Sequence, residues 1–525
     1  IVMGLALLLI LPAVLLMFGG DSETDEDMSV DFDESGTEEP QTLGVSAVSI
    51  FENPEQEAEF TRTGQIVSDN LFGANAVYSI NTEEGNLNET FRSAVDAFEI
   101  ENLRFPAGQA EPKQGDEKGV DWIDITELTD DGELRSELTA CLDSVEGGVT
   151  LTISTAHLST DEYGEGLEEW SELVMTKYGD LVDAFEIGNE YWSHMGETEY
   201  GAKANIAIKA LSNGIDAAGV EHADILVQMA STFAQSEFHS SLDDRGFNDR
   251  LTDANQQIID QLDNRAKSEL DGVLAHYYWN KGSDSFNDPS SEVNYIDRDL
   301  QIWEQNFDQD LNLHITEWNV KASNEETYGM KGVGVMVEMV ENMVELGVDK
   351  GDVWPLVHNT TNDLGGADDG VIETDDEDRV VETVRGAIFD LMSDALPGME
   401  RIILDLESVN DDMELAAYEK DGEFVIYIAN SSDAAESIEV DLNELLPDFD
   451  SATAVKVGYD KETSDGRLYS MSQRSMVQAE TVRLEGENYY LNEHDTGATL
   501  TDYAYSSALF NVDLNPFEVI QITAR

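Results

Sequence analysis

Two acidic side chains in this sequence follow apolar segments and are flanked by aromatic residues. The stretch FEIGNEYW at 185–192 has Asn189 and Glu190 directly after an apolar run, and LHITEWNV at 313–320 has Glu317 after another. Paired carboxyl groups can cleave a glycosidic bond, because one donates a proton to the leaving oxygen while the other, ionised, attacks the anomeric carbon. The first question is therefore whether Glu190 and Glu317 meet in the fold.

The segment from 66 to 396 alternates short apolar runs with helical patterns. The helical periodicity is clear over 165–178 and over 332–346. Apolar strands that alternate with helices are typical of parallel strands covered on both faces. The eight candidate strands end near Asn75, Arg104–Pro106, His157, Glu190, Ser231, Tyr278, Glu317 and His358. Eight such units predict a (β/α)8 TIM barrel rather than an open doubly wound sheet.

Residues 397–525 show the two-residue alternation of antiparallel strands. ELAAYEKDGEFVIYIAN contains two such runs joined by Asp421-Gly422, which predicts a type I′ hairpin. Short strands continue to the last residue, so we expect a C-terminal all-β sandwich. Residues 19–65 are interpreted as an acidic linker, of which 43–65 either stay linker or add a strand to the sandwich.

The strand ends of a (β/α)8 barrel open on one face, where active sites lie. Glu190, at the end of the fourth strand, and Glu317, at the end of the seventh, are then expected to face each other. Aromatic residues gather at these strand ends, namely Trp192, Trp279, Trp318, Trp354, Tyr191, Tyr277 and Tyr278. Because flat rings match the C–H faces of sugars, the cluster predicts a sugar platform, although core packing is the alternative for any single ring.

The motifs EIGNE on the fourth strand and ITEWN on the seventh resemble those of clan A glycoside hydrolases, retaining enzymes with a barrel of this kind. LRFPAG on the second strand and HYY on the sixth resemble motifs of the α-L-arabinofuranosidase and heparanase/β-glucuronidase families of that clan. The resemblance implies that Glu190 is the acid/base and Glu317 the nucleophile in the hydrolysis of a poly- or oligosaccharide. Tyr191 departs from the Pro or Met expected after the acid/base, so the substrate stays open.

Further residues at the strand ends are predicted to contact the substrate or the nucleophile. By the resemblance, Asn189 hydrogen-bonds the sugar 2-OH and Tyr278 donates to Glu317. His276 faces the barrel interior if Tyr278 does, because alternate residues of a strand share a face. The predicted substrate-binding set is Asn189, Arg104, His276, Tyr278, Trp318 and Trp354.

The sequence allows two interpretations of Arg104. It is either a positive charge beside Glu317 or a structural partner of Glu186 inside the barrel. His157 and His194 are interpreted as loop histidines, since no ligand spacing predicts a metal site. We therefore expect the site to work with neither a metal nor a cofactor.

The chain is strongly acidic, with 111 acidic against 28 basic residues and a net charge of −83. Such a surface repels nucleic-acid phosphates and anionic membranes, so we exclude both as partners of the folded part. The expected partner is a carbohydrate, as the carboxyl groups, the aromatic cluster and the resemblance indicate. The single cysteine, Cys141, excludes an intrachain disulfide framework.

The start of the chain is apolar and then acidic. Residues 1–18 carry no charge, and 21–40 contain ten acidic residues and no basic one. The apolar segment matches either a signal-peptide core or a membrane anchor, with a buried helix as a third alternative, and the acidic stretch matches a solvated spacer. The first two interpretations place the folded part outside the cytoplasm, extracellular or on the cell surface.

The main alternative to a glycosidase is a non-catalytic acidic surface protein that binds polysaccharide or packs in an envelope layer. The acidic spacer and apolar start suit that protein equally well. The presence of both Glu190 and Glu317 favours the hydrolase. A polysaccharide lyase, the third class, must neutralise a uronate, and the scarcity of Lys and Arg argues against it.

We predict that the protein is more stable in high salt. Repulsion among its charges extends far at low ionic strength, because the Debye length is about 30 Å at 0.01 M and about 3 Å at 1 M. Thermal melts at these two sodium chloride concentrations should give the higher melting temperature at 1 M. An unchanged melt would show that the charges are locally compensated.

Overall fold

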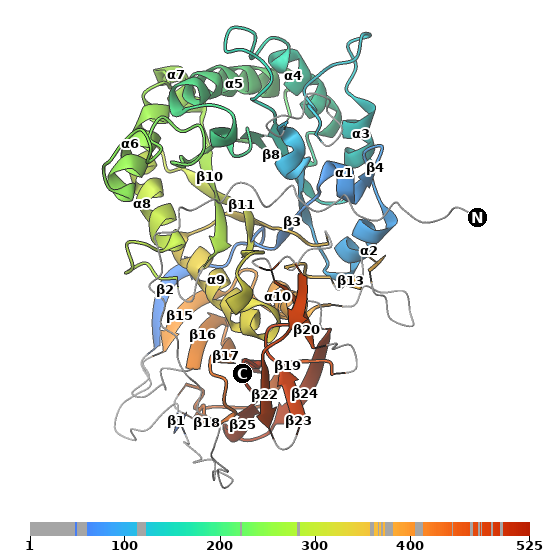
Figure 1. Cartoon of the computed structure of the whole chain (residues 1–525), viewed down its shortest axis with the longest axis vertical. Coiled ribbons are helices and arrows are strands. Elements are labelled where there is room, and N and C mark those ends of the chain that lie inside the picture. The colour runs from blue at the N-terminus through green and yellow to red at the C-terminus, as the bar shows by residue number, and fades with distance from the viewer. Residues whose placement is uncertain are drawn as a thin grey trace, which may run out of the picture. The chain divides into compact units, whose positions relative to one another are not determined.

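Eight of the apolar runs form parallel strands that close into a barrel (Figure 1). In this computed structural model the barrel strands are β3 (Gly73–Asn75), β6 (Asn102–Phe105), β7 (Gly148–Ile153), β8 (Val182–Ile187), β9 (Asp224–Gln228), β10 (Gly272–Trp279), β11 (Asn312–Val320) and β12 (Lys350–Val353). They pair in this order, and β12 returns to β3. The predicted (β/α)8 barrel is therefore confirmed.

The structure describes residues 48–49 and 60–525, apart from 113–121, 221–222, 281–283, 358–361, 366, 369–370, 373–381, 405–412, 444, 462–465, 471–472, 474, 485–486 and 494–496. The apolar segment 1–18, most of the acidic linker and the predicted strand end at His358 lie outside these residues. Within the described part of the chain, no helix combines the length and apolar character needed to cross a membrane.

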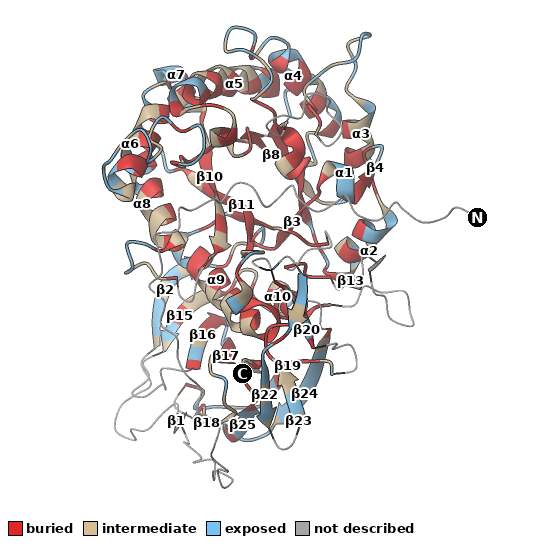
Figure 2. Cartoon of the chain, in the orientation of Figure 1, coloured by how far each residue is buried: buried red, intermediate tan, exposed pale blue. Residues whose placement is uncertain are grey.

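The outer helices bury the apolar face that their periodicity predicts. In α4 (Leu167–Tyr178), Leu167, Trp170, Val174 and Tyr178 are all buried, and Figure 2 shows the same inward burial around the barrel. The other helices are α1 (Tyr78–Asn81), α2 (Glu89–Ala97), α3 (Ser136–Leu142), α5 (Glu197–Ala218), α6 (Phe247–Ile259), α7 (Asn264–Glu269), α8 (Glu292–Glu304), α9 (Val333–Leu346) and α10 (Val384–Ala395). Cys141 is buried in α3, where burial raises the pKa of its thiol to about 12.

Short helices and short strand pairs lie in the loops of the barrel and in the loops of the C-terminal region. Four are short helices, η1 (Ala107–Ala110), η2 (Tyr191–Ser193), η3 (Glu325–Thr327) and η4 (Gly329–Gly332). The others are two-stranded pairs, β4 (Thr82–Glu83) with β5 (Asn86–Leu87), β13 (Ala367–Asp368) with β14 (Val371–Ile372), β20 (Arg467–Ser470) with β21 (Ser475–Gln478), and β22 (Thr481–Leu484) with β23 (Glu487–Tyr490).

The C-terminal region is a β-sandwich, as predicted. Its larger sheet has the order β2 (Phe60–Ile66), β15 (Glu400–Leu404), β16 (Met413–Lys420), β17 (Glu423–Asn430), β26 (Val519–Ala524), β19 (Ala452–Tyr459) and β24 (Ala498–Tyr505). The smaller sheet has the order β1 (Val48–Ser49), β18 (Glu436–Asp441) and β25 (Leu509–Leu514). Strand β2 precedes the barrel in the chain but pairs with β15.

The hairpin and the core of the sandwich follow from the alternating pattern. Asp421 and Gly422, between β16 and β17, both have positive φ (53° and 87°), as a type I′ turn requires. Ile426 and Ile522 of the larger sheet belong to one apolar cluster with Val440 of the smaller sheet. The two sheets therefore bury their inner faces against each other.

The barrel contacts the sandwich through α9 and α10. Helix α9 packs against β16 and β17, and α10 against β19 and β24. At this contact Arg401 forms ion pairs with Glu341 and Glu345. Glu338 lies in the same region, where burial and then the charges of Glu414 and Glu341 raise its pKa from 4.5 to about 8.

We predict that Glu338→Gln makes the protein more stable at alkaline pH. Because the pKa of Glu338 is raised on folding, its carboxyl group favours the folded state fully below pH 4.5 and loses that contribution as the pH rises through about 8. Urea unfolding of the variant at pH 8.5 should give a free energy of unfolding higher by about 1 kcal/mol or more, with little gain at pH 5. Glu172→Gln, an exposed position on α4, controls for the loss of one surface charge.

Candidate active site

Glu317 reaches the barrel interior through a bulge in β11. Ala275 of β10 pairs with Ile315, but the next residue, His276, pairs with Glu317, so Thr316 is an extra residue in the strand. A bulge changes the face on which the following side chains lie. Glu317 consequently faces the interior, where it is 7% exposed, and its neighbour Trp318 faces the outer helices.

Glu190 lies three residues beyond β8, in a left-handed backbone conformation with φ 46° and ψ 51°. Its N–H donates to Oε1 of the buried Gln228, at the end of β9, over 2.6 Å. Gly188 also has a positive φ of 80°, and a Cβ there would lie 3.1 Å from Oγ1 of Thr155. Strained backbone of this kind persists where surrounding contacts fix it, and it is common at functional sites.

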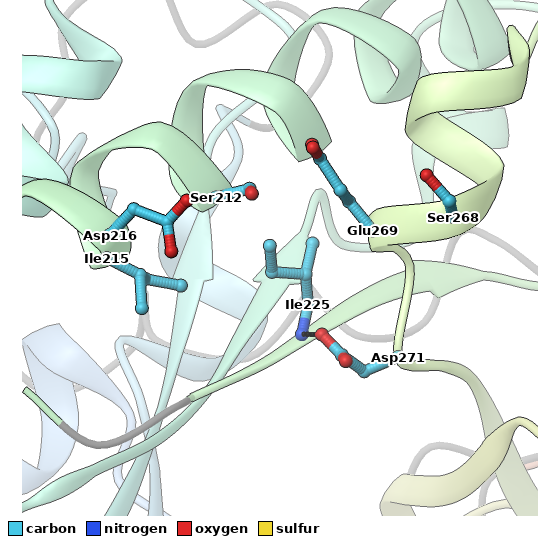
Figure 3. A pocket seen from close by; sticks show the side chains of 7 residues that line it. All are labelled: Ser212, Ile215, Asp216, Ile225, Ser268, Glu269 and Asp271. Carbon is cyan, nitrogen blue, oxygen red and sulfur yellow. Dashed lines mark hydrogen bonds between the residues drawn. The ribbon is translucent and has the colours of Figure 1, made fainter.

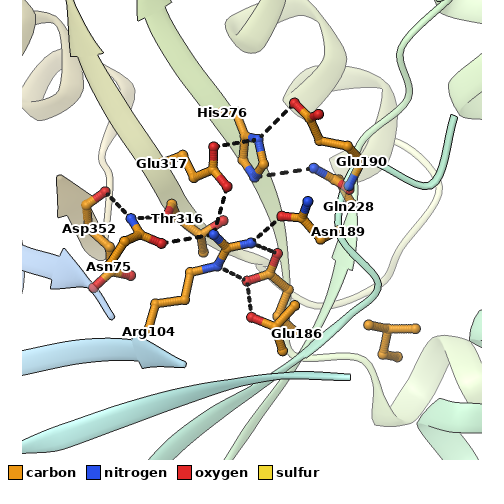
Figure 4. A network of polar contacts seen from close by, with 12 residues as sticks. Asn75, Arg104, Glu186, Asn189, Glu190, Gln228, His276, Thr316, Glu317 and Asp352 are labelled. Atoms are coloured by element: carbon orange, nitrogen blue, oxygen red, sulfur yellow. Dashed lines mark hydrogen bonds and ion pairs between the residues drawn. The ribbon is translucent and has the colours of Figure 1, made fainter. Parts of the chain in front are cut away.

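Arg104 joins these strands from the centre of the barrel and is fully buried (Figure 4). Its Nε and Nη2 donate to the two carboxylate oxygens of Glu186 over 2.6 and 2.7 Å. Its Nη1 donates to Oε1 of Glu317 over 2.8 Å and to Oδ1 of Asn75 over 2.9 Å. Nη2 also donates to Oδ1 of Asn189 over 2.6 Å. Both interpretations of Arg104 therefore hold, because it contacts Glu186 and Glu317 at once.

Tyr278 and Arg104 hold the carboxyl group of Glu317 ionised. The hydroxyl of Tyr278 donates to Oε2 of Glu317 over 2.8 Å. Burial, and then the charge of Glu317, raise the pKa of Tyr278 well above its usual value, so it remains a phenol that can donate. Burial disfavours the ionised form of Glu317, but His276, Arg104 and Tyr278 outweigh it and lower the pKa of Glu317.

His276 lies between the two predicted catalytic carboxyl groups. Its Nδ1 is 3.4 Å from Oε1 of Glu190 and 3.5 Å from Oε2 of Glu317. These two oxygens are therefore no more than about 7 Å apart. This limit is compatible with the separation of about 5–5.5 Å between the carboxyl groups of retaining glycosidases. It excludes most of the separations of inverting enzymes, which are about 6.5–9.5 Å. Burial disfavours the imidazolium, but Glu317 and Glu190 favour it and raise the pKa of His276.

The amide of Asn189 has a fixed orientation. Because its Oδ1 accepts from Arg104, its Nδ2 is directed away from the guanidinium. A Cβ built on Gly108, in η1, would lie 3.7 Å from this Nδ2, 3.7 Å from Oε1 of Glu317 and 3.6 Å from the ring of Trp354. Gly108 and Trp354 are partly exposed, so this group of residues lies next to solvent at the mouth of the barrel.

The predicted aromatic platform needs correction. Trp318 has no exposed surface, and its ring packs against Phe389 of α10, so it is a core residue and cannot contact a substrate. The reason is alternation, since adjacent strand residues face opposite sides and Glu317 takes the inner one. The same alternation buries Tyr277 and Trp279 outside the barrel, and Tyr191 is also fully buried, stacked on Tyr200. Trp192 and Trp354 keep partial exposure.

One group of side chains near the mouth has the composition of a metal site. Ligand atoms of Asp124, Glu127 and His157 all lie within 4.8 Å of one another. However, Nε2 of His157 already lies 2.9 Å from Asp124, and Glu127 binds Arg135 over 2.6 Å. Hydrogen bonds and an ion pair therefore account for this group, and it gives no separate support for a metal.

A pocket of about 180 Å³ lies away from these carboxyl groups, beside the N-terminal ends of β9 and β10 (Figure 3). Its lining includes Asp216, Glu269 and Asp271. Asp271 is engaged there, because it accepts from the backbone N–H of Ile225 over 2.9 Å. Since active sites of this fold lie at the C-terminal ends of the strands, this pocket is not the candidate active site.

Sequence reasoning missed Gly108, Gln228 and Asn75. Gly108 is the last residue of the LRFPAG motif, and Gln228 is the only polar residue inside the apolar run ILVQMA. A glutamine in an otherwise apolar barrel strand is the signal that could have drawn attention to Gln228. The sequence predicts Asn75 only as the end of the first strand, with no role in the site; its Nδ2 donates to the carbonyl of Thr316 over 3.0 Å and to that of Asp352 over 3.1 Å.

Solved structures share this architecture although sequence comparison finds no relative. No protein-family model matches the chain, and no curated protein matches it in sequence. The fold is similar to AbfB, a family 51 α-L-arabinofuranosidase from Bifidobacterium longum, with a TM-score of 0.56, 11% identity and coverage of 89% of this chain and 98% of that one.

Two further structures are similar over most of both chains. CelM2, a bifunctional glucanase-xylanase from a metagenome library, gives a TM-score of 0.52 at 10% identity, covering 91% of this chain and 98% of that one. A 4-O-α-L-rhamnosyl-β-D-glucuronidase from Fusarium oxysporum gives 0.52 at 12% identity, covering 91% and 100%. The resemblance to clan A glycoside hydrolases is thus confirmed for the fold, and the activity has to be argued from the site.

Proposed function

We propose that this protein is a retaining glycoside hydrolase that acts on a poly- or oligosaccharide. The observation that carries the proposal is the position of Glu190 and Glu317, both within 3.5 Å of the same imidazole nitrogen at the mouth of the barrel. Their surroundings differ in a way that suits two roles. His276, Arg104 and Tyr278 outweigh burial and lower the pKa of Glu317, whereas the side chain of Glu190 is 25% exposed.

In the first step of the proposed reaction, Glu317 attacks the anomeric carbon and the glycosidic bond breaks. Glu190 gives its proton to the leaving oxygen, so a glycosyl-enzyme forms on Glu317 and Glu190 becomes a carboxylate. In the second step Glu190 takes a proton from water, whose oxygen attacks the anomeric carbon and releases Glu317. The residue that starts as acid thus ends each cycle protonated again.

The accessible space beside Gly108 is where we place the sugar ring. Asn189 directs its Nδ2 into this space and can donate to the sugar 2-OH, an interaction that strengthens in the transition state. Trp354 offers a partly exposed ring on the same side. Gly108 itself lacks a side chain where one would compete with the sugar for contact with Glu317.

We also propose that the folded part acts outside the cytoplasm. The support is the apolar segment 1–18 followed by the acidic stretch 21–40. Expression of the full chain in its own cells, with fractionation and protease protection of intact cells, tests this proposal. Recovery of the protein only in the cytoplasm would contradict it.

The stereochemical course of the reaction is our main prediction for this site. If the two carboxyl groups lie about 5–5.5 Å apart, as in retaining enzymes, Glu317 attacks directly and the first product keeps the anomeric configuration of the substrate. A panel of aryl glycosides and polysaccharides identifies a substrate, and proton NMR in the first minutes of reaction shows the configuration. An inverted first product would contradict the proposed mechanism.

Two variants separate the roles of the carboxyl groups. Glu317→Ala should be inactive on every substrate. Glu190→Ala should still react at the first step with substrates that have good leaving groups, and azide should restore turnover because it needs no base. If no substrate distinguishes wild type from Glu317→Ala, the non-catalytic polysaccharide-binding alternative is favoured.

We predict that Gly108→Val lowers activity without unfolding the protein. Position 108 has no positive φ, and an added Cβ meets its neighbours at ordinary contact distance, but the valine methyl groups would extend into the space for the sugar. We expect kcat/KM to fall by about tenfold or more, equivalent to about 1.4 kcal/mol. Gly246→Val, where a Cβ meets nothing within 4 Å, is the matched control. Equal activity of both variants would remove Gly108 from the sugar site.

A further inference from the structure

Gln228 contacts both the backbone of Glu190 and the ring of His276. Its Oε1 accepts from the N–H of Glu190 over 2.6 Å, and its Nε2 lies 3.4 Å from Nε2 of His276 (Figure 4). The side chain is fully buried. Its backbone is held too, because the N–H of Gln228 donates to the hydroxyl of Tyr200, which donates to the carbonyl of Ile187.

These contacts fix which end of the Gln228 amide faces the histidine. If the amide were turned over, its NH2 group would face the N–H of Glu190, and two donors would oppose each other. The oxygen therefore faces Glu190 and the NH2 group faces His276. An NH2 group can only donate, so it favours a neutral ring in which Nε2 presents its lone pair and the proton is on Nδ1.

Nδ1 of His276 is a buried nitrogen that lies between Glu190 and Glu317. At 3.4 and 3.5 Å these contacts are about as long as the 3.4 Å contact of Nε2 with Gln228, but Nδ1 has no hydrogen-bond partner among the residues that the structure describes. A small movement of the ring or of one carboxylate would complete a bond to one of them. Nδ1 of His276 is therefore positioned to donate a hydrogen bond to either Glu190 or Glu317.

We propose that Gln228 is a positioning residue that keeps the single proton of His276 on Nδ1, so that His276 donates in turn to whichever of Glu317 and Glu190 is ionised. This alternation rests on the proposed glycosidase mechanism. Before the first step Glu317 is the carboxylate and takes the bond. In the glycosyl-enzyme Glu317 is a neutral ester and Glu190 is the carboxylate, so the bond passes to Glu190.

The surroundings of His276 have opposing effects on the binding of a second proton to its ring. Burial and the charge of Arg104 oppose the imidazolium, but Glu317 and Glu190 favour it and on balance raise the pKa of His276, so the ring is neutral only above that raised pKa. The second proton would occupy Nε2, where it would meet the NH2 group of Gln228. If the ring is neutral, the combined charge of His276, Glu190 and Glu317 also stays the same throughout, because one of the two carboxyl groups is ionised in each half of the reaction.

Nitrogen NMR of the whole chain, labelled with ¹⁵N-histidine, tests the protonation directly. His276→Asn identifies the His276 signals by their loss. We expect that in the wild-type protein, at a pH above the raised pKa of His276 where the ring is neutral, Nδ1 carries the proton and Nε2 carries none. A neutral ring with its proton on Nε2 would overturn the proposal, and this result does not depend on finding a substrate.

Gln228→Glu is the variant that separates positioning from packing. One carboxylate oxygen can still accept from the N–H of Glu190, while the other accepts a hydrogen bond from a protonated Nε2, so the doubly protonated form of His276 is stabilised. We expect its titration to move up by about one pH unit or more. Gln109→Glu is the matched control, because its Oε1 also accepts a backbone N–H over 2.6 Å and its Nε2 contacts a hydroxyl that can donate instead. An unchanged His276 titration in Gln228→Glu would overturn the proposal.

Kinetics add a second measurement once a substrate is known. A positive charge on His276 favours the ionised form of Glu190, which is then missing as the acid in the first step. The alkaline limb of the profile of kcat/KM against pH should therefore move to lower pH in Gln228→Glu and stay in place in Gln109→Glu. If the wild-type protein and the Gln109→Glu control were both inactive on all substrates while the NMR result held, the proposed hydrolase activity would fail. The proposed position of the His276 proton would still stand.

Discussion

The five hydrogen bonds of one buried guanidinium group determine the arrangement of the site. A guanidinium carries five N–H donors in one plane, and Arg104 uses all of them on Glu186, Glu317, Asn75 and Asn189. The acceptors come from three strands and their ends, β3, β8 and β11, so a single planar group sets the position of each relative to the others. Removing one partner of such a buried pair is costly, by about 3–5 kcal/mol in comparable cases, because it leaves an uncompensated charge.

The charge balance around Arg104 also explains why two carboxylates can be buried so close together. Glu186 takes two donors of the guanidinium and Glu317 takes one, together with the hydroxyl of Tyr278. Glu190 receives none of these donors, and its side chain keeps contact with solvent. Glu317 and Glu190, which are chemically identical, thus have different surroundings. This difference is the condition for Glu317 to remain an anion and for Glu190 to exchange a proton.

The interior of this barrel is unusually polar for a folded core. The apolar cluster inside it consists of Ala184, Leu226 and Leu274. Below the site, Lys350 of β12 pairs with Asp183 of β8 over 3.1 Å, and these strands lie on opposite sides of the barrel. Burial raises the pKa of Asp352 on β12 to about 7. Most of the stabilising apolar contacts therefore lie outside the barrel, between its strands and the helices, and the interior holds the groups that position Glu317 and Glu190.

The sequence by itself determined the strands, the barrel, the sandwich and the two carboxyl groups. Those predictions depend on local patterns, since apolar runs, helical periodicity and the Asp421-Gly422 turn are properties of neighbouring residues. The parity of His276 and Tyr278 was predictable for the same reason, because both lie on one regular strand. The fold comparisons then agreed with the architecture that these patterns predict.

Only the tertiary structure decided which side chains share the site. The bulge at Thr316 turns Glu317 inward and Trp318 outward, and its place depends on how β11 pairs with β10. The contacts of Arg104 with both Glu186 and Glu317, and of Gln228 with both Glu190 and His276, join strands that are far apart in the chain. No local pattern encodes such contacts, because they arise where closure of the barrel brings the strand ends together.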